Sequence, residues 1–600
     1  MQSLTRLNHY FIRYWRLYVP GLLFTMISAV FAIAVPVVVR QAIDSLPKFE
    51  RIYRQFEATA IEHPLYWDFF WTILIFGLVI IALSLSNGFF TFLMRQTVVV
   101  ASRHIEFDIR NTLYEHLQKL SNSFYHHTKT GDVITRATSD IEQVRRYIGP
   151  AIMYITRALV IVIAAITAML VISPTLTMYA LMPLSLLAVS IFVVAQLVHK
   201  RSEALQRQYA QLTSRVQETL SGIRLVKAYA RETTETQAFE QESRLYKIKM
   251  LGLARVEAAW RPVFLVVVGL SEIMVVWIGG QLVADGIITI GNVAEYIIYV
   301  ALMTWPVAAF GLVISMMQRA SASAERIYEV LDQDPDISDT SLTDPLIQTI
   351  DGCVTFDRVS FRYQDGLPYA LEDISFQVPA GQSLAIVGRT GSGKTTLIDL
   401  ICRLYEPTHG HISIDDQDLQ KLPLATLRDS IGYVPQDVFL FSDTIGNNIA
   451  FGTVDATEDE ILQSSLEAEL HETIVEFADG LDSEVGERGV SLSGGQAQRT
   501  TIARALIRNP RILILDDALS SVDTKTENRI LEHLRRRHGH HTMFLISHRI
   551  SSIRGADQII VLEQGRIAER GTHESLMESE GLYAQMYQRQ LLEERLEAIQ

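Results

Sequence analysis

The amino-acid sequence predicts an α-helical six-span transmembrane domain followed by a cytosolic α/β domain. Apolar runs of about 20 residues, long enough to cross a bilayer, occur only in the first half of the chain. The 600 residues are 48% hydrophobic yet 20% charged, as expected when one half is soluble in lipid and the other in water. Beyond about residue 319, short β-rich segments alternate with helical ones, which is typical of an α/β domain.

The composition excludes several other classes of protein. The net charge of −14 argues against nucleic acid as a partner. Cys353 and Cys402 are the only cysteines in the sequence, which rules out a disulfide scaffold and a cysteine-rich zinc site. With 33 Gly and 17 Pro, neither residue is enriched, so a fibrous or largely disordered chain is also excluded.

Six segments are apolar and long enough to be membrane spans. They cover residues 18–38, 69–93, 151–172, 175–198, 262–283 and 288–316. Ser173 and Pro174 form the tight turn that is predicted between the third and fourth spans. The first span is too long for a signal peptide, and no clear small-residue cleavage site follows it.

Basic residues near the span ends predict the orientation, because cytosolic loops carry an excess of Lys and Arg. These residues lie before the first span, after the second, before the third and after the fourth: Arg6, Arg13, Arg16, Arg95, Arg103, Arg145, Arg146, His199, Lys200 and Arg201. We therefore expect a multi-pass protein of the cell membrane (the inner or plasma membrane) with both termini in the cytoplasm.

Two connections between spans are much longer than packing requires. About 55 residues separate the second and third spans and about 60 the fourth and fifth, against roughly 2–8 in ordinary helical bundles. Their apolar spacing is helical, so their tips, near residues 125–140 and 221–231, are expected far from the membrane. Thr130-Gly131-Asp132 is predicted to form the turn at the first tip. Either the tips dock on the soluble half and carry motion to the spans, or the connections are solvated coiled linkers.

These features divide the chain into four parts. We predict a transmembrane domain at residues 1–325, a linker at 326–351, an α/β domain at 352–580 and a helical tail at 581–600. The linker contains a polar stretch with two prolines, Pro335 and Pro345, and this composition is typical of a connection between domains.

A phosphate-binding loop lies between a predicted buried strand at residues 384–387 and a helix that begins near Thr396. The loop has the complete G-x-x-x-x-G-K-[ST] pattern in the required context: Gly388, Arg389, Thr390, Gly391, Ser392, Gly393, Lys394 and Thr395. Its backbone N–H groups are expected to surround phosphate oxygens, with Lys394 at the β- and γ-phosphates and Thr395 on Mg²⁺. The second half is therefore predicted to be a P-loop NTPase domain.

Two adjacent acids follow a second apolar strand at residues 512–515. A Mg²⁺-associated carboxylate is needed at the end of a buried strand beside the phosphate loop, and Asp516 is the candidate for that role. Asp517 is the candidate for orienting the attacking water. The alternative is a pair of acids that only caps the following helix.

The motifs of the second half, taken together, resemble those of ATP-binding cassette (ABC) proteins. Leu492 precedes the residues that resemble the signature of this family: Ser493, Gly494, Gly495 and Gln496. Its other motifs follow in the family's order and spacing: the adenine-stacking aromatic at Tyr363, the Q-loop at Gln436, the exporter loop at 484–489, the D-loop at 520–523 with Asp523, and the switch histidine at His548. The six spans with two long loops match the family's exporter half-transporters, so the resemblance covers nearly the whole chain.

This resemblance implies a partner and a set of roles. In the family two nucleotide domains pair head to tail, and each ATP lies between the phosphate loop of one and the signature of the other. A second half-transporter subunit is therefore expected. ATP and Mg²⁺ are the implied cofactors. The implied roles are hydrolysis for Asp517, His548 and Gln436; Mg²⁺ binding for Thr395, Gln436 and Asp516; and ATP binding for Tyr363, the loop from Gly388 through Thr396, the signature and Asp523.

One position departs from the family pattern. Members that hydrolyse ATP efficiently usually carry Glu after the Mg²⁺ aspartate, where this chain has Asp517. One methylene fewer retracts the carboxylate by up to about 1.5 Å, and a misplacement near 1 Å costs on the order of 10²-fold in rate. A weakened acid with an intact signature resembles one subunit of the heterodimeric exporters, whose partner carries the reverse combination. The alternative is a homodimer with slow turnover at two equal sites.

Several side chains inside the spans are candidates for contact with a substrate. Glu272 lies midway along the fifth span, where a charge costs about 2.5–3.5 kcal/mol and should therefore face the interior or a cavity. It either favours cationic amphipathic substrates or is a protonated side chain hydrogen-bonded to another helix. Arg157 and Glu295 are weaker cases because they lie where a side chain reaches the interface. The sixth span offers four residues that either line an apolar cavity or belong to the core: Met303, Trp305, Phe310 and Met316.

The sequence thus predicts a subunit of an ATP-driven exporter of the multidrug and lipid group, which works on a small amphipathic substrate within membrane lipid. An ATP-gated regulatory or channel-like protein is the alternative that Asp517 leaves open, although no inserted regulatory domain supports it. A cassette protein that acts on ribosomes or DNA is excluded by the six spans.

Overall fold

The computed structural model describes residues 2–56, 62–486, 492–536 and 539–597. The chain folds into two compact units. The helical unit comprises Met1–Gln118 and Thr130–Gln333, and the α/β unit comprises Lys119–Lys129 and Asp334–Gln600. A short segment from the first half of the sequence therefore belongs to the same unit as the second half.

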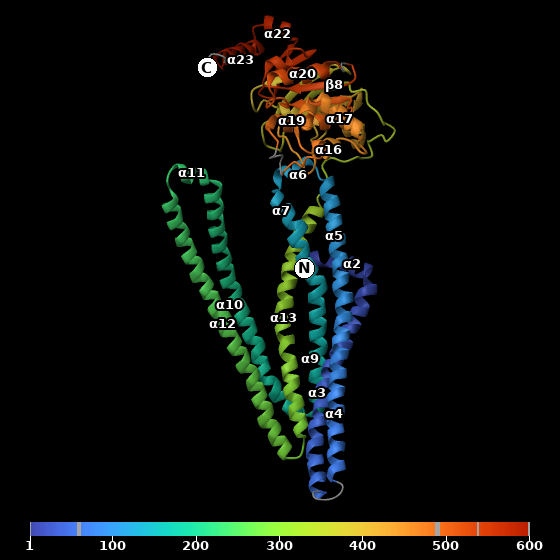
Figure 1. The fold of residues 1–600 in the computed structure, drawn as a ribbon, viewed down its shortest axis with the longest axis vertical. Helices are drawn as coiled ribbons and strands as arrows, with labels where there is room; N and C mark the ends of the chain where they lie inside the picture. The colour runs from blue at the N-terminus through green and yellow to red at the C-terminus, as the bar shows by residue number, and fades with distance from the viewer. Residues whose placement is uncertain (1, 57–61, 487–491, 537–538, 598–600) are drawn as a thin grey trace. The chain divides into compact units, whose positions relative to one another are not determined.

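The helical unit consists mainly of long helices (Figure 1). In chain order its elements are α1 (Gln2–Thr5), α2 (Asn8–Arg13), α3 (Trp15–Gln55), α4 (Glu62–Met94), η1 (Arg95–Val99), α5 (Val100–Lys119), α7 (Thr130–Thr135), η2 (Arg136–Asp140), α8 (Ile141–Arg146), η3 (Tyr147–Ala151), α9 (Ile152–Ile172), α10 (Pro174–Ser221), α11 (Ile223–Ala228), α12 (Glu232–Ala284) and α13 (Ile290–Leu331). The predicted spans coincide with α3, α4, α9, α10, α12 and α13. By length and composition, five described helical segments can cross a membrane, and α10 is not among them.

Side-chain caps fix where two of the spanning helices begin. The Oγ of Ser173 accepts a hydrogen bond from the N–H of Leu176 at 3.3 Å, and Pro174 occupies the first helical position of α10, where its missing N–H leaves nothing unpaired. At the start of α13, Thr289 and Asn292 form a reciprocal capping box. The tight turn predicted between the third and fourth spans is confirmed.

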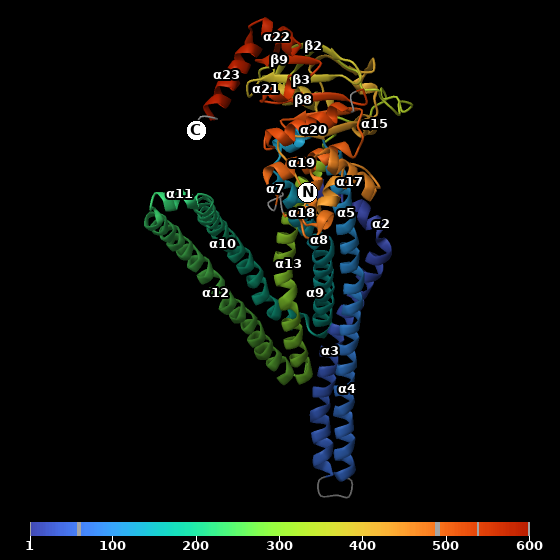
Figure 2. The ribbon, with the colours of Figure 1, turned by 45° about the horizontal axis from the view of Figure 1, so that its top comes forward.

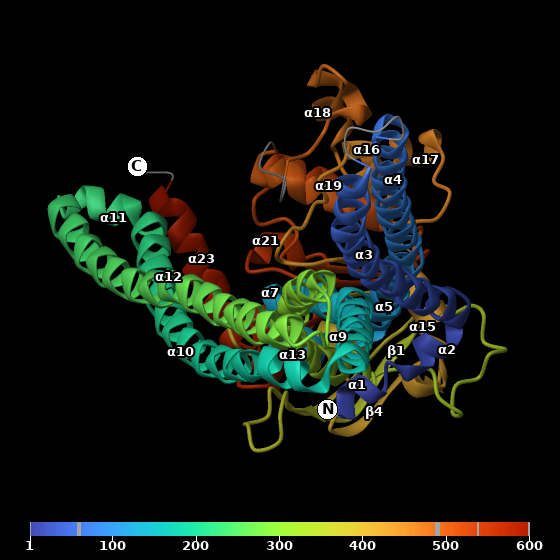
Figure 3. The ribbon, with the colours of Figure 1, turned by 90° about the horizontal axis from the view of Figure 1, so that it is seen from below.

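The hairpin of α10 and α12, closed by α11, diverges from the other helices of the helical unit. Figures 1 and 2 show its closed end well apart from α9 and α13, and the view from below in Figure 3 shows the same separation. At the opposite end the hairpin shares an apolar core with α9 and α13, which includes Met169, Leu176, Ala180, Val275, Tyr296 and Tyr299. The second tip, predicted near residues 221–231, is confirmed as α11.

The first tip differs from the prediction in one respect. The short helix α6 (Asn122–His127) forms the tip, and the chain turns at residues 128 and 129 before α7 begins. Thr130-Gly131-Asp132 is therefore the first turn of a helix, and the turn predicted there was wrong. Asp132 stabilises the start of α7 because a carboxylate in the first turn complements the helix dipole, and this outweighs the turn preference of Gly131.

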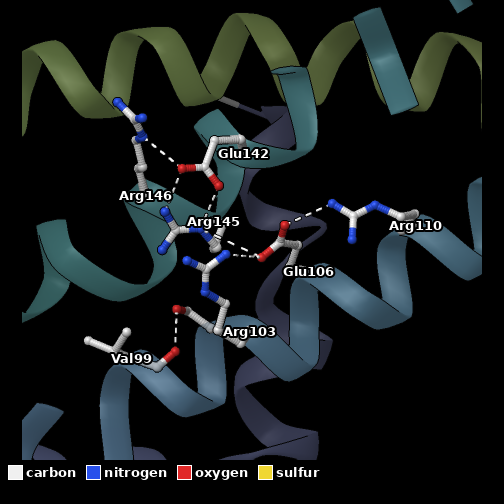
Figure 4. Close-up of polar contacts among 8 residues, drawn as sticks. Val99, Arg103, Glu106, Arg110, Glu142, Arg145 and Arg146 are labelled. Atoms are coloured by element: carbon white, nitrogen blue, oxygen red, sulfur yellow. Dashed lines mark hydrogen bonds and ion pairs between the residues drawn. The ribbon is translucent and has the colours of Figure 1, made fainter. Parts of the chain in front are cut away.

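Charged side chains join α5 to α8 within the helical unit (Figure 4). The largely buried carboxylate of Glu106 pairs with Arg103 at 2.9 Å, Arg110 at 2.8 Å and, across the helix contact, Arg145 at 3.6 Å. Arg145 also donates to Glu142 and thereby lowers the pKa of Glu142 to about 2. The helical extensions of two spans, α5 after α4 and α8 before α9, are therefore tied together by a shared ionic network.

An ion pair joins α3 to α13: Arg40 lies just beyond the predicted first span, and Glu295 lies in the predicted sixth span. Glu295 is 1% exposed, and its carboxylate accepts hydrogen bonds from Arg40 at 3.2 Å and from the hydroxyl of Tyr299 at 3.0 Å. A charge in the bilayer needs such a partner. The sequence pointed to Glu295 but not to Arg40, because 255 residues separate them and no local pattern links them.

The α/β unit contains two sheets. Its strands are β1 (Val354–Phe361), β2 (Leu371–Val378), β3 (Ser383–Gly388), β4 (His409–Ile414), β5 (Gln417–Asp418), β6 (Ile431–Val434), β7 (Ile512–Asp516), β8 (Thr542–Ile546), β9 (Gln558–Glu563) and β10 (Arg566–Gly571). The first sheet is antiparallel, in the order β2-β1-β4-β5. The second has the order β10-β9-β3-β8-β7-β6 and is parallel except for β10.

Helices complete the α/β unit. They are α6 and α14 (Lys394–Ile401), η4 (Leu419–Lys421), α15 (Leu424–Asp429), α16 (Ile445–Ala450), α17 (Glu458–Glu467), α18 (His471–Glu476), η5 (Gly480–Asp482), α19 (Gly494–Leu506), α20 (Thr524–Arg536), α21 (Ile550–Ile553), α22 (His573–Glu578) and α23 (Leu582–Glu597). Strands β3, β7 and β8 are buried along their whole length, which explains their continuous apolar sequences.

The strand register brings the site segments to one edge of the larger sheet. Ile546 of β8 pairs with Ile386 of β3 on one side and with Asp516 of β7 on the other. The loops that follow these parallel strands therefore emerge next to each other. The strands predicted at residues 384–387 and 512–515 are confirmed as β3 and β7.

Candidate nucleotide site

The phosphate loop joins β3 to α14, and its glycines determine its shape. Gly388, Gly391 and Gly393 have φ values of 155°, 81° and 99°, where a side chain would be strained. A Cβ atom on Gly388 would lie 2.3 Å from the carbonyl oxygen of Leu562, and one on Gly393 would lie 2.6 Å from that of Ala370. A Cβ on Gly391 would meet nothing within 4 Å. The loop thus packs closely on the protein at two glycines and is open at the third.

Lys394 is the buried cation of this loop. Its Nζ donates to the carbonyl oxygens of Gly388 at 2.9 Å and Arg389 at 3.0 Å. Burial lowers the pKa of Lys394, and the nearby carboxylates of Asp516 and Asp517 partly oppose this effect. Phosphate oxygens would give the ammonium charged partners and strengthen its hydrogen bonds.

Two buried oxygen atoms near the loop, Ser392 Oγ and Asp516 Oδ2, have no hydrogen-bond partner among the described residues. An unpaired buried polar atom costs about 1–3 kcal/mol, so a ligand that supplies partners is favoured here. A phosphate oxygen suits Ser392, and Mg²⁺ suits Asp516. Burial raises the pKa of Asp516, and a hydrogen bond from Thr395 opposes that rise. The residues present therefore fit ATP together with Mg²⁺.

Asp517 lies in a strained backbone conformation at the end of β7. Its φ is 48°, in the left-handed region that few non-glycine residues adopt, and its N–H donates to the carbonyl oxygen of Ile546 at 2.9 Å. Strain of this kind is found at functional sites, where the surrounding structure holds it in place. The hydrogen bond to β8 holds Asp517 at the cavity.

One cavity of about 300 Å³ brings most of the predicted site residues together. Its lining consists of Tyr363, Ala370, Thr390, Gly391, Gly393, Lys394, Thr395, Thr396, Gln436, Asp516, Asp517, Ile546 and His548. Tyr363 is 46% exposed and its hydroxyl is hydrogen-bonded to Thr396 at 2.8 Å, which leaves the ring accessible for stacking. Gly388, Arg389 and Ser392 belong to the loop but do not line the cavity.

The signature residues do not line this cavity. Ser493 caps α19: its Oγ accepts from the N–H of Gln496 at 3.3 Å, and Gln496 Oε1 accepts from the N–H of Ser493 at 2.9 Å. Ser493 and Gly494 are exposed. Gly495 does not line the cavity either. The same holds for Asp523, the last residue of the D-loop, which directly precedes α20. The resemblance assigns the signature to the ATP held by the phosphate loop of another subunit, and within one chain these residues do not line the cavity beside the chain's own phosphate loop.

The exporter loop predicted at residues 484–489 is only partly described, because residues 487–489 lie outside the described residues. Glu484 forms a β-bridge with Thr444.

Sequence reasoning also missed Tyr405, whose ring centroid lies 5.3 Å from that of Tyr363. No motif includes Tyr405, and only the packing of the α/β unit reveals this contact.

Comparison with known proteins matches both halves of the chain to ABC transporter families. The family of the ABC transporter transmembrane region matches residues 18–307. The family described as ABC transporter matches residues 371–520, within the α/β unit. The chain is 34% identical over 598 residues to the multidrug resistance-like ATP-binding protein MdlA of Escherichia coli, a match that covers 100% of this chain and 98% of that relative. The chain belongs to the ABC transporter family.

Another relative and a solved structure indicate which kind of ABC transporter this chain resembles. It is 38% identical over 485 residues to the probable multidrug resistance ABC transporter ATP-binding/permease protein YheI of Bacillus subtilis, covering 81% of this chain and 83% of that one. It is also similar to a bacterial Atm1-family ABC exporter with ATP bound, with a TM-score of 0.77 and 28% identity over 96% of this chain and 98% of the other. The protein is thus a multi-pass membrane ABC exporter of the multidrug type, whose ATP-binding domain hydrolyses ATP in support of transport.

Proposed function

We propose that this ABC exporter chain is one subunit of a heterodimer that moves amphipathic drugs or lipids out of the cytosol or the inner leaflet. The observation that carries the proposal is the intact, exposed signature outside the chain's own cavity, combined with Asp517 in place of Glu. The signature would complete the active site of a partner, whereas the chain's own site would bind ATP and turn it over slowly. A homodimer with slow turnover at two equal sites is the competing arrangement.

The cavity supports a specific arrangement of ATP and Mg²⁺. Tyr363 would stack on the adenine, Lys394 would hold the β- and γ-phosphates, and Thr395, Asp516 and Gln436 would hold Mg²⁺. The ion supplies positive charge that neutralises the phosphate oxygens during transfer. Asp517 and His548 lie in the same cavity, where they would orient the attacking water and hold the γ-phosphate.

The shorter side chain of Asp517 is the reason to expect slow turnover at this chain's own site. Aspartate and glutamate have similar reference pKa values, so a loss of basicity does not distinguish them. The length of the side chain does distinguish them, because the carboxylate of aspartate is retracted by up to about 1.5 Å relative to that of glutamate. The strained backbone of Asp517, anchored to Ile546, leaves little freedom to recover that distance.

The contacts of α6 support a path between the site and the spans. Tyr405 accepts a hydrogen bond from Asn122 at 3.3 Å and lies beside Tyr363, while Gln364 contacts His127 at 3.2 Å. A change at the adenine-binding ring would therefore reach α6 through Tyr405. Both loop tips would then shift the spans from an inward-facing to an outward-facing arrangement, with both termini in the cytosol.

The tip of α11 supports a role for the partner in this motion. Leu225 is 65% exposed and Tyr229 is 75% exposed, both on the closed end of the α10–α12 hairpin. Apolar side chains that are concentrated at a tip are expected to be buried against another surface. We assign that surface to the nucleotide domain of the partner subunit.

Glu272 supports a preference for cationic amphipathic substrates. It is half-buried and makes no hydrogen bond or ion pair with any described residue, whereas its neighbour Ser271 donates to the carbonyl oxygen of Ala180 on α10 at 2.5 Å. A protonated Glu272 bonded to another helix is therefore less well supported than a carboxylate that faces a cavity. In the sixth span, Met303 is buried in the helical core, which argues against a lining role for that residue.

The test is the ATPase rate of the chain purified alone in lipid, with Lys394→Ala as the blank. We expect a rate close to the blank with ATP still bound, and a rise of about tenfold or more on Asp517→Glu, because the restored methylene returns the carboxylate to the water. Ordinary turnover of about 1 s⁻¹ or more by the unmodified chain would contradict the heterodimer. ATP-dependent dye transport in vesicles, once the partner is added, would separate a pump from an ATP-gated regulator.

A further inference from the structure

The side chain of the switch histidine, His548, is exposed and makes no hydrogen bond with any described residue. Its position is therefore set by the backbone on either side of it. The N–H of Arg549 donates to Ser547 Oγ at 3.0 Å, and the N–H of Ile550 donates to Gln590 Oε1 of α23 at 2.8 Å. The side chain of Arg549 is a further anchor of this short segment.

The guanidinium of Arg549 reaches across to the D-loop, the turn at residues 520–523. Its Nη2 donates to the carbonyl oxygen of Ser520 at 3.2 Å, and its Nη1 donates to that of Val522 at 3.2 Å. The planar fork of Arg allows one side chain to hold two carbonyls of the same turn, which the single ammonium of Lys does not reproduce. Arg549 thus joins the segment of His548 to the loop that follows Asp517.

Glu527 holds the guanidinium in this orientation. The carboxylate of Glu527, whose side chain is 3% exposed, accepts from Arg549 Nη1 at 2.8 Å and from the hydroxyl of Ser552. A buried carboxylate needs such charged and polar partners, so the pair is strongly favoured over either residue alone. Glu527 lies on α20, directly after the D-loop, and therefore fixes the distance between that loop and α21.

A second side chain holds the same turn from the signature side. Gln498 of α19 is 3% exposed; its Nε2 donates to Ser520 Oγ at 3.0 Å and its Oε1 accepts from the N–H of Ser521 at 2.8 Å. The D-loop is therefore held by α19 on one side and by Arg549 on the other. Among the side-chain hydrogen bonds of the described residues, those of Arg549 connect this turn to the segment that carries His548.

We propose that Arg549 is a positioning residue for ATP hydrolysis, which fixes the switch histidine relative to the D-loop through the Ser520 and Val522 carbonyls and the buried Glu527. Arg549 does not line the nucleotide cavity, so it contributes to the geometry of the reaction rather than to ATP affinity. The role is independent of whether the transporter is a heterodimer or a homodimer.

The test compares Arg549→Lys with Arg554→Lys in the full transporter in lipid. Arg554 is the matched control because it is an exposed arginine at the end of the same helix, α21. Hydrolysis is measured in the natural chain and with Asp517→Glu, so that turnover at this chain's own site is visible in either subunit arrangement. ATP affinity is measured separately, and hydrogen exchange is followed in the peptides that cover residues 517–526 and 544–552.

We expect Arg549→Lys to lower kcat by about tenfold with KM and ATP affinity within about twofold of the unmodified protein. Exchange in both peptides is expected to speed up by about tenfold, because hydrogen bonds that hold the turn are lost. Glu527→Gln, which leaves Arg549 in place but weakens its anchor, should give a smaller change in the same direction. Arg554→Lys should change none of these values.

Unchanged exchange in both peptides after Arg549→Lys would overturn the proposal, whatever the rate of hydrolysis. A parallel loss of kcat and ATP affinity together with a lower melting temperature would also overturn it, because that pattern describes a merely structural residue. If Arg549→Lys fails to fold, Glu527→Gln decides the question by the same exchange and kcat criteria.

Discussion

In the phosphate-loop half of the nucleotide site, Ser392 and Asp516 each carry a buried oxygen that has no partner within the described part of the chain, and the backbone of Asp517 is strained. The signature half is built differently, since Ser493 and Gln496 satisfy each other's polar groups in a capping box at the surface. Unpaired atoms and strain mark a half that is completed by a ligand. In the signature half the capping box satisfies these polar groups without a ligand.

The largest effect is expected from a substitution in the phosphate-loop half of the site. Lys394→Ala removes the ammonium held at the Gly388 and Arg389 carbonyls, so we expect ATP binding to fall by at least about 10²-fold, consistent with the loss of a charge-assisted contact to two phosphates. Equilibrium binding of a fluorescent ATP analogue measures the change. Binding within threefold of the unmodified chain would contradict the role of Lys394.

The corresponding substitution in the signature half is Gly495→Ala. A Cβ at this position would lie 2.8 Å from the carbonyl oxygen of Ser521, so α19 and the D-loop must shift apart. We expect ATP binding by this chain to stay within about twofold, while hydrolysis by the proposed dimer falls by about 10²-fold because of a misplacement near 1 Å. The measurements are analogue binding and steady-state ATPase. Loss of binding by this chain would show that the two halves are not separate.

A smaller effect is expected where the phosphate-loop half meets α6. Tyr405→Leu removes the hydroxyl that accepts from Asn122 and the aromatic contact with Tyr363. We expect transport per ATP hydrolysed to drop several-fold, with ATP binding nearly unchanged, because one neutral hydrogen bond and one ring contact contribute about 1–2 kcal/mol together. Dye uptake and ATPase in the same vesicles give the ratio. An unchanged ratio would exclude Tyr405 from the coupling path.

The smallest expected effect concerns the cost of burying an acid beside the phosphate loop. Burial raises the pKa of Asp399 from 3.8 to about 6, with a further contribution from Asp516. Because the pKa is raised in the folded state, the ionised carboxylate destabilises the fold; this penalty is absent below about pH 4, grows between pH 4 and 6 and is complete above pH 6. Asp399→Asn should therefore add about 1–2 kcal/mol to stability at pH 7.5 and nothing at pH 4.

Melting curves of the nucleotide-free transporter at the two pH values measure this change. The control on the signature side is Asp523→Asn. Hydrogen bonds from the backbone and side chain of Thr526 lower the pKa of the exposed Asp523, so its carboxylate contributes stability above its unfolded pKa that is lost as the pH falls. The control should lower the melting temperature at pH 7.5 or leave it unchanged. A rise for both variants at both pH values would contradict the assignment to Asp399.

The sequence by itself determined the features that depend on neighbours in the chain. The spans follow from uninterrupted apolar runs, and β3 with its loop follows from a pattern of eight consecutive residues, from Gly388 to Thr395. Local chemistry also determined the capped turn at Ser173-Pro174. It failed at Thr130-Gly131-Asp132, where the helix start provided by Asp132 outweighed the turn preference of Gly131.

Only the tertiary structure decided which residues meet across long separations. Arg40 reaches Glu295, Asn122 reaches Tyr405 and Arg549 reaches Ser520, and none of these pairs follows from a local pattern. The signature, which the family resemblance already assigned to the ATP of another subunit, lies outside the cavity of its own chain, although both belong to one unit. Residues close in sequence share a backbone whose geometry is known in advance, whereas distant residues meet only where sheet order and helix packing place them.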